Sequence, residues 1–332
     1  MLKKIILFLF CSLFLAGPAP AALDLVWPPP PDKARIQFKR AITNPADIGI
    51  QKSFFKKLWD FLAGEEEEAL VRPFGLAVKN GSLFITDSAQ LTFHIMDFQG
   101  KSYKLVSNEK AKMQAPVGIA VTKDGKVLVA DSLSARILVF NTRGDFTGNF
   151  AGGFVFQRPT ALSVSPVDGT VWVVDTLAHR IIKFNPSGEK LLVVGKRGLQ
   201  RGEFNYPSGV TVARDGRVFV CDTLNARIQI FSPEGKFLSA FGKQGDSTGD
   251  FSHPKSVALD SDGNIYVVDG LFDAVQIFDE KGRLLLVFGL RGTREGEFYV
   301  PSSIAIDEQD NIYVADSYNK RVQQFRYIKE SQ

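Results

Sequence analysis

Six aspartates recur at one position of a repeated pattern, and a ring of carboxylates is an arrangement that could do chemistry. Each one ends an apolar segment: Asp87, Asp131, Asp175, Asp222, Asp269 and Asp316. Carboxylate oxygens are ligands that hard cations such as Ca²⁺ prefer, so one reading of the set is a metal site. The sequence around each aspartate decides between that reading and a structural one.

Arginine follows the aspartate by five residues in four of the six copies, at Arg136, Arg180, Arg227 and Arg321. The first and fifth copies carry Thr92 and Ala274 at that position instead. A carboxylate with a cationic partner at fixed spacing is typical of an ion pair or a loop cap that fixes the geometry of a hairpin. We therefore assign a structural role to the pairs Asp131 and Arg136, Asp175 and Arg180, Asp222 and Arg227, and Asp316 and Arg321.

The three histidines, His94, His179 and His253, occupy different positions of the repeat. A zinc site needs about three converging nitrogen or sulfur ligands, so we expect no metal from this set. The sequence also contains no Gly-x-Ser-x-Gly nucleophile elbow, phosphate-binding loop or Cys-x-x-Cys pair. We therefore nominate no catalytic residue and no cofactor.

The elements that carry these residues come from a repeat of 43 to 48 residues. Six segments align, and each begins at a proline: Pro73, Pro116, Pro159, Pro207, Pro254 and Pro301. Within each unit, period-two alternation and Asp-Gly turns predict a meander of four antiparallel strands. Because such a sheet has two apolar faces, neighbouring sheets must stack around an axis to bury them. The sequence therefore predicts an all-β, six-bladed β-propeller with four-stranded antiparallel blades.

The ring needs one strand from elsewhere, because the sixth unit ends after a third strand at 321–328. Residues 34–42 alternate in the right way to supply it, so we expect closure by this N-terminal strand. The predicted propeller spans 34–328, with the closing strand at 34–42, a helical insertion at 43–72 and the repeats at 73–328.

The repeated motif resembles the NHL-repeat family. It is most explicit in GEFNYPSGVTVARDGRVFVCDTLNARIQIF and GEFYVPSSIAIDEQDNIYVADSYNKRVQQF. The resemblance implies a propeller fold, but its members include binding proteins, sensors and a few enzymes, so it does not fix the function. Amidating lyases similar to this family place metal-binding histidines directly after the blade-opening proline. None of those positions holds a histidine here, which argues against that chemistry.

Two sets of residues form a predicted binding rim at one end of the ring. The residues after each proline should border the central channel: Phe74, Val117, Thr160, Ser208, Lys255 and Ser302. The loops between blades should bring basic residues to the same end: Lys196, Arg197, Arg201, Lys243, Arg291 and Arg294. Such a rim suits an anionic or polar partner, although these charges could equally serve only to solvate long loops.

Two N-terminal segments precede the propeller. Lys3, Lys4, an apolar run of about 12 residues and a small-residue stretch predict a signal peptide at 1–22, cleaved near Ala21 or Ala22 and exporting the protein to the periplasm or beyond. Residues 23–33 are rich in proline and suggest an extended segment.

An amphipathic helix is expected within the insertion, over 51–63. Its apolar face gathers Phe54, Phe55, Leu58, Trp59, Phe61 and Leu62. Three uses stay open for it: packing on its own propeller, docking into a partner, and contact with a membrane surface.

Composition narrows the partners. The chain has 332 residues and a formal net charge of +4. This positive charge is much smaller than that expected of a dedicated nucleic-acid-binding protein, so we expect no nucleic-acid partner. Cys221 would be the one cysteine left after cleavage, so no disulfide is expected. The leading hypothesis is a monomeric, non-catalytic extracytoplasmic scaffold that binds another protein or a cell-envelope component. The alternative is a propeller enzyme of the lactonase or lyase kind with a metal at the central channel.

Overall fold

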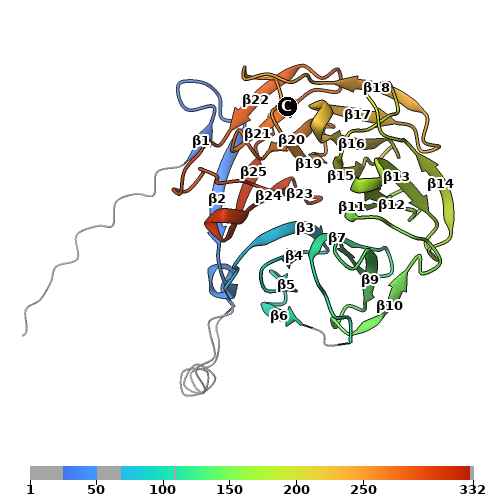
Figure 1. Ribbon diagram of the computed structural model, residues 1–332. Helices are drawn as coiled ribbons and strands as arrows, with labels where there is room; N and C mark the ends of the chain where they lie inside the picture. The colour runs from blue at the N-terminus through green and yellow to red at the C-terminus, as the bar shows by residue number, and fades with distance from the viewer. Residues whose placement is uncertain (1–24, 51–68, 108–109, 330–332) are drawn as a thin grey trace, which may run out of the picture.

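A computed structural model describes residues 25–50, 69–107 and 110–329. Six antiparallel sheets surround a central channel, and each sheet is one blade (Figure 1). The first blade contains β3 (Pro73–Lys79), β4 (Ser82–Asp87), β5 (Thr92–Asp97) and β6 (Ser102–Val106). The second contains β7 (Pro116–Val121), β8 (Val127–Asp131), β9 (Arg136–Phe140) and β10 (Phe146–Phe150). The third contains β11 (Pro159–Val164), β12 (Val171–Asp175), β13 (Arg180–Phe184) and β14 (Lys190–Val194).

The remaining blades repeat this order. The fourth contains β15 (Pro207–Val212), β16 (Val218–Asp222), β17 (Arg227–Phe231) and β18 (Phe237–Phe241). The fifth contains β19 (Pro254–Leu259), β20 (Ile265–Asp269), β21 (Ala274–Phe278) and β22 (Leu284–Phe288). The sixth contains β23 (Ser303–Ile306), β24 (Asn311–Asp316) and β25 (Arg321–Tyr327) from the C-terminal end of the chain. The predicted all-β propeller of six four-stranded blades is thus confirmed.

The sixth blade is completed from the N-terminal side. Strand β2 (Ile36–Ile42) pairs antiparallel with β25, from Ile36 opposite Tyr327 to Ile42 opposite Val322. This pairing confirms the predicted closure by an N-terminal strand. A further short strand, β1 (Val26–Trp27), pairs with β2 inside the segment expected to be Pro-rich and extended. The Trp27 ring lies 5.8 Å from the rings of both Phe288 and Phe325, so this part of the segment packs on the propeller.

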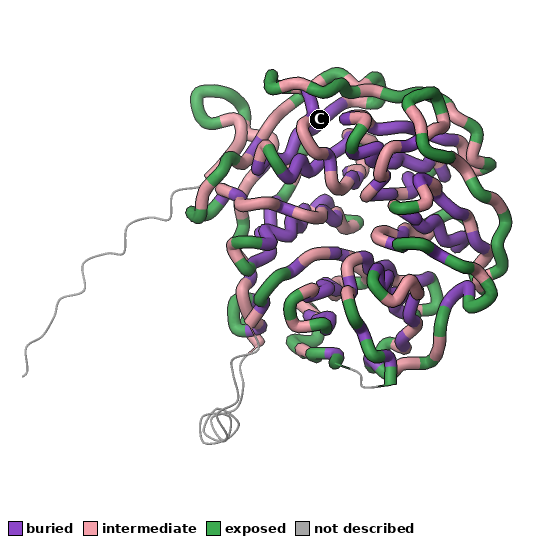
Figure 2. Tube along the Cα trace, viewed as in Figure 1, coloured by how far each residue is buried: buried purple, intermediate pink, exposed green. Residues whose placement is uncertain are grey.

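Burial explains why the strands differ in sequence. Every residue of β8, β12, β16 and β20 is buried, because the second strand of a blade is covered by neighbouring blades on both faces. The residues of the outer strands β14 and β18 are all partly buried or exposed and do not alternate strictly, which is why their pattern is weaker in the sequence. Buried residues accordingly lie within the blades, and exposed residues lie along the outer edge and in loops (Figure 2).

The core consists of six apolar clusters, and each lies between two adjacent blades. One joins Trp172 and Val174 of the third blade to Val220 of the fourth. The cluster that closes the ring joins Tyr313 of the sixth blade to Leu76 of the first. The apolar faces of each sheet are therefore buried against its neighbours, which is the arrangement that the repeat predicted.

Among the described residues, the helices are short 3-10 turns: η1 (Pro45–Ile48), η2 (Thr176–Ala178), η3 (Thr223–Asn225) and η4 (Ser317–Asn319). None of them could span a membrane. The predicted helix at 51–63 and the predicted signal peptide at 1–22 lie outside the described residues.

Candidate functional site

The six recurring aspartates are completely buried at one end of the ring. Each ends the second strand of its blade, and in the first five blades it lies opposite the proline that begins the first strand, as Asp175 lies opposite Pro159. The carboxylates accept hydrogen bonds from the backbone N–H groups that precede this proline. Asp175, for example, accepts from the backbone N of Arg158 at 2.7 Å. These aspartates therefore fix the entry of each blade, and the described residues contain no cluster of three or more metal-binding side chains.

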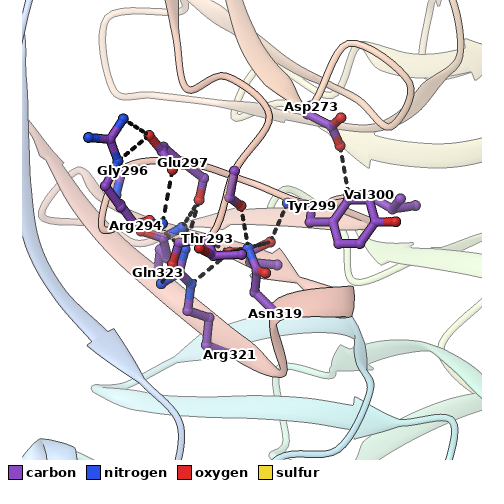
Figure 3. A network of polar contacts seen from close by, with 12 residues as sticks. Asp273, Thr293, Arg294, Gly296, Glu297, Tyr299, Val300, Asn319, Arg321 and Gln323 are labelled. Atoms are coloured by element: carbon purple, nitrogen blue, oxygen red, sulfur yellow. Dashed lines mark hydrogen bonds and ion pairs between the residues drawn. The ribbon is translucent and has the colours of Figure 1, made fainter.

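Three of the four expected Asp–Arg pairs form. The Nε–Oδ2 distances are 3.1 Å for Arg180–Asp175, 2.7 Å for Arg227–Asp222 and 2.7 Å for Arg321–Asp316. In the sixth blade, Arg321 also donates to the carbonyl oxygens of Thr293, Arg294 and Glu297 (Figure 3). The arginine thus ties the loop between two blades to the buried carboxylate.

The expected pair of Asp131 and Arg136 differs from the other three. Arg136 donates instead to Ser134 Oγ at 3.2 Å and to the Ala111 carbonyl at 3.1 Å. Asp131 accepts from the backbone N–H groups of Gln114 and Ala115 and so still acts as a loop cap. In the second blade, the Arg136 guanidinium therefore donates to Ser134, whereas the equivalent arginines of the third, fourth and sixth blades donate to the aspartate.

The first and fifth blades, which lack the arginine, surround their aspartates differently. In the first blade, His94 Nε2 lies 3.8 Å from Asp87 Oδ2, and His94 Nδ1 lies 3.0 Å from the Tyr103 hydroxyl. Burial alone would raise the pKa of Asp87, but His94 and the preceding backbone N–H groups hold that pKa at about 2. In the fifth blade, Asp269 accepts hydrogen bonds from the backbone N–H groups of Ser252, His253, Leu271 and Phe272.

The three histidines are used separately. His94 is enclosed in the first blade, whereas His179 Nδ1 accepts a hydrogen bond from the backbone N of Tyr206. Burial lowers the pKa of His179, and the charge of Arg197 lowers it further. Burial likewise lowers the pKa of His253, with a second contribution from the Lys255 charge. Each histidine therefore has its own local environment on a different blade.

The first strands of the blades line a central cavity of about 1020 Å³. All six residues expected to border the channel line this cavity: Phe74, Val117, Thr160, Ser208, Lys255 and Ser302. They lie at the end where the prolines and buried aspartates meet, and we call this end of the cavity the mouth. Arg158, Ser132 and Thr176 line the cavity at the same end.

Hydroxyl pairs connect neighbouring blades around the mouth. Thr160 Oγ1 lies 2.6 Å from Thr176 Oγ1, which donates to the Pro207 carbonyl of the next blade. Equivalent pairs join Ser208 to Thr223 and Ser302 to Ser317. In these three blades the polar groups at the mouth are therefore partly occupied in holding adjacent blades together.

The fifth blade replaces this hydroxyl pair with Lys255 and Gly270. A Cβ atom at position 270 would lie only 3.1 Å from Lys255 Cγ and 3.2 Å from the Pro301 carbonyl oxygen. The glycine thus leaves the space along which the lysine side chain runs. Sequence reasoning did not single out Gly270, although the alignment shows glycine where Thr176, Thr223 and Ser317 stand in other units.

Lys255 is a partly buried cation without an ion-pair partner. Within the part of the chain that the structure describes, no carboxylate lies within 4.0 Å of its Nζ atom. Burial lowers the pKa of Lys255, and the more distant charge of Asp269 opposes that effect only in part. A cation held in this way gains most from an external anion, because none of the described residues supplies a close counter-charge.

The two ends of the cavity differ in charge. Among the described residues, the acidic side chains that line it all lie at the turns opposite the mouth: Asp215, Asp260, Asp262, Glu280, Asp307 and Glu308. The charged side chains that line the mouth, Lys255 and Arg158, are cationic. The same turns also carry Lys79, Arg214 and Arg217, so six acidic and three basic side chains leave that end net negative, and an anion is favoured at the mouth.

The six loop cations of the predicted rim do not line the cavity. Four of them form ion pairs within this end of the ring, which join Lys196 to Glu203, Lys243 to Asp250, Arg291 to Asp273 and Arg294 to Glu297. The Arg201 guanidinium lies over the Phe237 ring, 5.8 Å from its centroid, and Arg197 forms an isolated backbone bridge to Phe204. The residues of the predicted rim therefore fall into two groups. The six residues after the prolines line the cavity, and the six basic residues lie in the outer loops.

Comparison with known proteins agrees with this architecture. The NHL repeat family model matches residues 113–140, 204–231 and 298–325. The chain is therefore a six-bladed β-propeller that carries NHL repeats. No curated protein is similar enough in sequence to match it.

Solved structures share the fold at low sequence identity. An auxiliary nutrient binding protein from Bacteroides ovatus superposes with a TM-score of 0.61 and 14% identity, covering 78% of this chain and 70% of that one. Virginiamycin B lyase from Staphylococcus aureus gives 0.56 and 12%, covering 78% and 96%. A gluconolactonase from Xanthomonas campestris gives 0.60 and 15%, covering 88% and 98%. The similar folds thus include both binding proteins and enzymes.

Proposed function

We propose that this propeller is a non-catalytic, exported binding scaffold whose mouth receives an anionic group of a protein or cell-envelope partner. The observation that carries the proposal is Lys255, which is partly buried at the channel and has no carboxylate within ion-pair distance among the described residues. Arg158, which lines the same cavity, adds a second cation at this end.

The same observations weigh against the lactonase or lyase alternative. Such an enzyme would need acidic and polar groups at the channel entrance to hold a metal or move protons. Two cations line the mouth, and the carboxylates at the opposite turns do not come together as a group of three or more metal-binding side chains among the described residues. Stoichiometric, tightly bound calcium or zinc in the purified protein would contradict the non-catalytic assignment.

Anion-dependent stability tests the proposal. We expect inorganic phosphate, added at constant ionic strength, to raise the free energy of unfolding of the unmodified protein. At a hundredfold excess over Kd, the increase should reach roughly 2.7 kcal/mol. Lys255→Met removes the charge and keeps a similar volume, so this variant should lose most of the increase.

Lys196→Met is the matched control, because it removes a cation from the outer loops at the same end. The control should keep the full response to phosphate, which also corrects for general salt effects on stability. Equal responses from the Lys255 and Lys196 variants would show that Lys255 does not bind the anion.

A further inference from the structure

The loops that follow the buried aspartates expose large apolar side chains around the mouth. The second residue after the aspartate is apolar in all six blades, and in five of them it is large and exposed: Leu133, Leu177, Leu224, Leu271 and Tyr318. The first blade has Ala89 at this position. We call these five residues the apolar ring. Leu133 and Leu271 are the most exposed, at 71% and 63%.

The apolar ring is presented by well-defined turns. Leu177, Leu224 and Tyr318 are the central residues of the 3-10 turns η2, η3 and η4. Each turn begins directly after a completely buried aspartate. Because the repeat places each loop at the same end of its blade, the five side chains surround the mouth on one face of the molecule. Soluble monomers seldom expose large apolar groups together on one face without a binding role.

The opposite face has a different character. At the turns opposite the mouth, Val167 is the one exposed large hydrophobic side chain among the described residues. The acidic residues of the cavity also lie at that end. Exposed large apolar side chains are thus concentrated on one face of the disc, whereas the turns of the other face carry both acidic and basic side chains.

Basic side chains outnumber acidic ones in the outer layer of the face that bears the apolar ring, where Asp246 and Glu295 are also exposed. In the ion pairs of Lys196, Lys243, Arg291 and Arg294, the cationic side chains are 74–84% exposed, whereas their carboxylate partners are 6–20% exposed. The carboxylates therefore lie beneath the cations. Arg72, Arg158 and Lys320 add exposed cationic residues on the same side.

We propose that this face docks onto the anionic surface of a lipid membrane, with the apolar ring entering the interfacial region and the surrounding cations meeting lipid phosphates. The proposal rests on the proposed function and names its partner: the anionic group received by the mouth is a lipid headgroup. Exposed apolar side chains surrounded by Lys and Arg are the combination that binds an anionic bilayer surface. The opposite face, which lacks the apolar ring, would point away from the membrane.

Vesicle sedimentation with the full-length mature protein tests this proposal. We expect binding to vesicles of phosphatidylethanolamine with phosphatidylglycerol, little binding to pure phosphatidylcholine, and release as the salt concentration rises. The double variant Leu133→Ser/Leu271→Ser should weaken binding on the order of a hundredfold, because each buried leucine contributes about a factor of ten or more. Leu177→Ser/Leu224→Ser is an independent second pair.

Two control variants replace an exposed apolar residue by serine outside the apolar ring. Val167→Ser lies at the opposite face and Leu285→Ser on an outer strand, and both should leave vesicle binding unchanged. Absence of vesicle binding, or equal binding by ring and control variants, would overturn the proposal. Self-association of the unmodified protein that disappears in the ring variants would also overturn it, because the face would then bind a second copy.

The two proposals fail in distinguishable ways. If phosphate stabilises the protein through Lys255 but vesicles do not bind, the mouth binds an anion and the membrane is not its source. If Lys255→Met leaves phosphate stabilisation intact, the proposed anion site fails whatever the vesicles show. The ring variants should keep the full phosphate response, because none of their side chains lines the cavity.

Discussion

At the scale of single residues, the buried aspartate is the same in every blade, and the residues next to it differ between blades. The buried aspartate is the same in all six units, whereas the residue after it is a hydroxyl-bearing side chain in five and Gly270 in the fifth blade. That change leaves the space in which Lys255 runs along the channel wall. The fifth blade therefore differs from the other blades by Gly270 and Lys255, and these two residues form the candidate anion site.

Asp87 gives a pH-dependent prediction. Because its pKa is held at about 2 in the folded protein, its ionised form stabilises the fold at pH values above about 4, and this contribution is lost as the pH falls through about 2. The loss should amount to about 2 kcal/mol. Urea unfolding should show that Asp87→Asn destabilises the protein strongly near pH 6 and much less near pH 2. A difference between the two proteins that stays constant over this range would contradict the assignment.

The sequence predicted the residues at the mouth better than those of the outer loops. Position in the repeat was enough to bring the six residues after the prolines to the channel. Ion pairing in the loops depends on how each loop folds back, so the carboxylates of Glu203 and Asp250 beneath the cations could not be inferred from spacing. Ser134, which captures Arg136, likewise acts through local geometry that only the structure shows.

At the scale of elements, the closing strand decides whether the ring is complete. Strand β2 supplies the fourth strand of the sixth blade, and its Ile36 is completely buried in the cluster between the fifth and sixth blades. The alternation of residues 34–42 was sufficient to predict this strand. The short strand β1 could not be predicted, because the prolines that follow it give no strand pattern. The structure shows that β1 pairs with β2 and that Trp27 packs on Phe288, so the sixth blade begins before the predicted strand at 34–42.

Shortening the buried side chain of Ile36 in the closing strand should destabilise the whole propeller. We expect Ile36→Ala to lower the free energy of unfolding by about 2–5 kcal/mol, because it leaves a cavity between two blades. Lys39→Ala, on an exposed position of the same strand, should change stability by less than about 0.5 kcal/mol. Equal effects in chemical denaturation would show that the closing strand does not hold the ring.

At the scale of the whole molecule, the propeller is a disc with two unlike faces. One face combines the mouth, the apolar ring and an outer layer rich in cations, while the turns of the other face carry both acidic and basic side chains. Blade number and closure followed from the sequence because every unit repeats the same pattern. The difference between the faces was only partly predictable, since it depends on which charges are outermost and which lie beneath them.

The claim on which the account depends is that Lys255 is a partly buried cation at the mouth that takes an external anion. The most direct measurement is an NMR pH titration of the Lys255 amine, assigned through its loss in Lys255→Met and recorded with and without phosphate. We expect the pKa of Lys255 to lie below the ordinary lysine value in the free protein and to rise when phosphate binds. An ordinary pKa that phosphate leaves unchanged would contradict it.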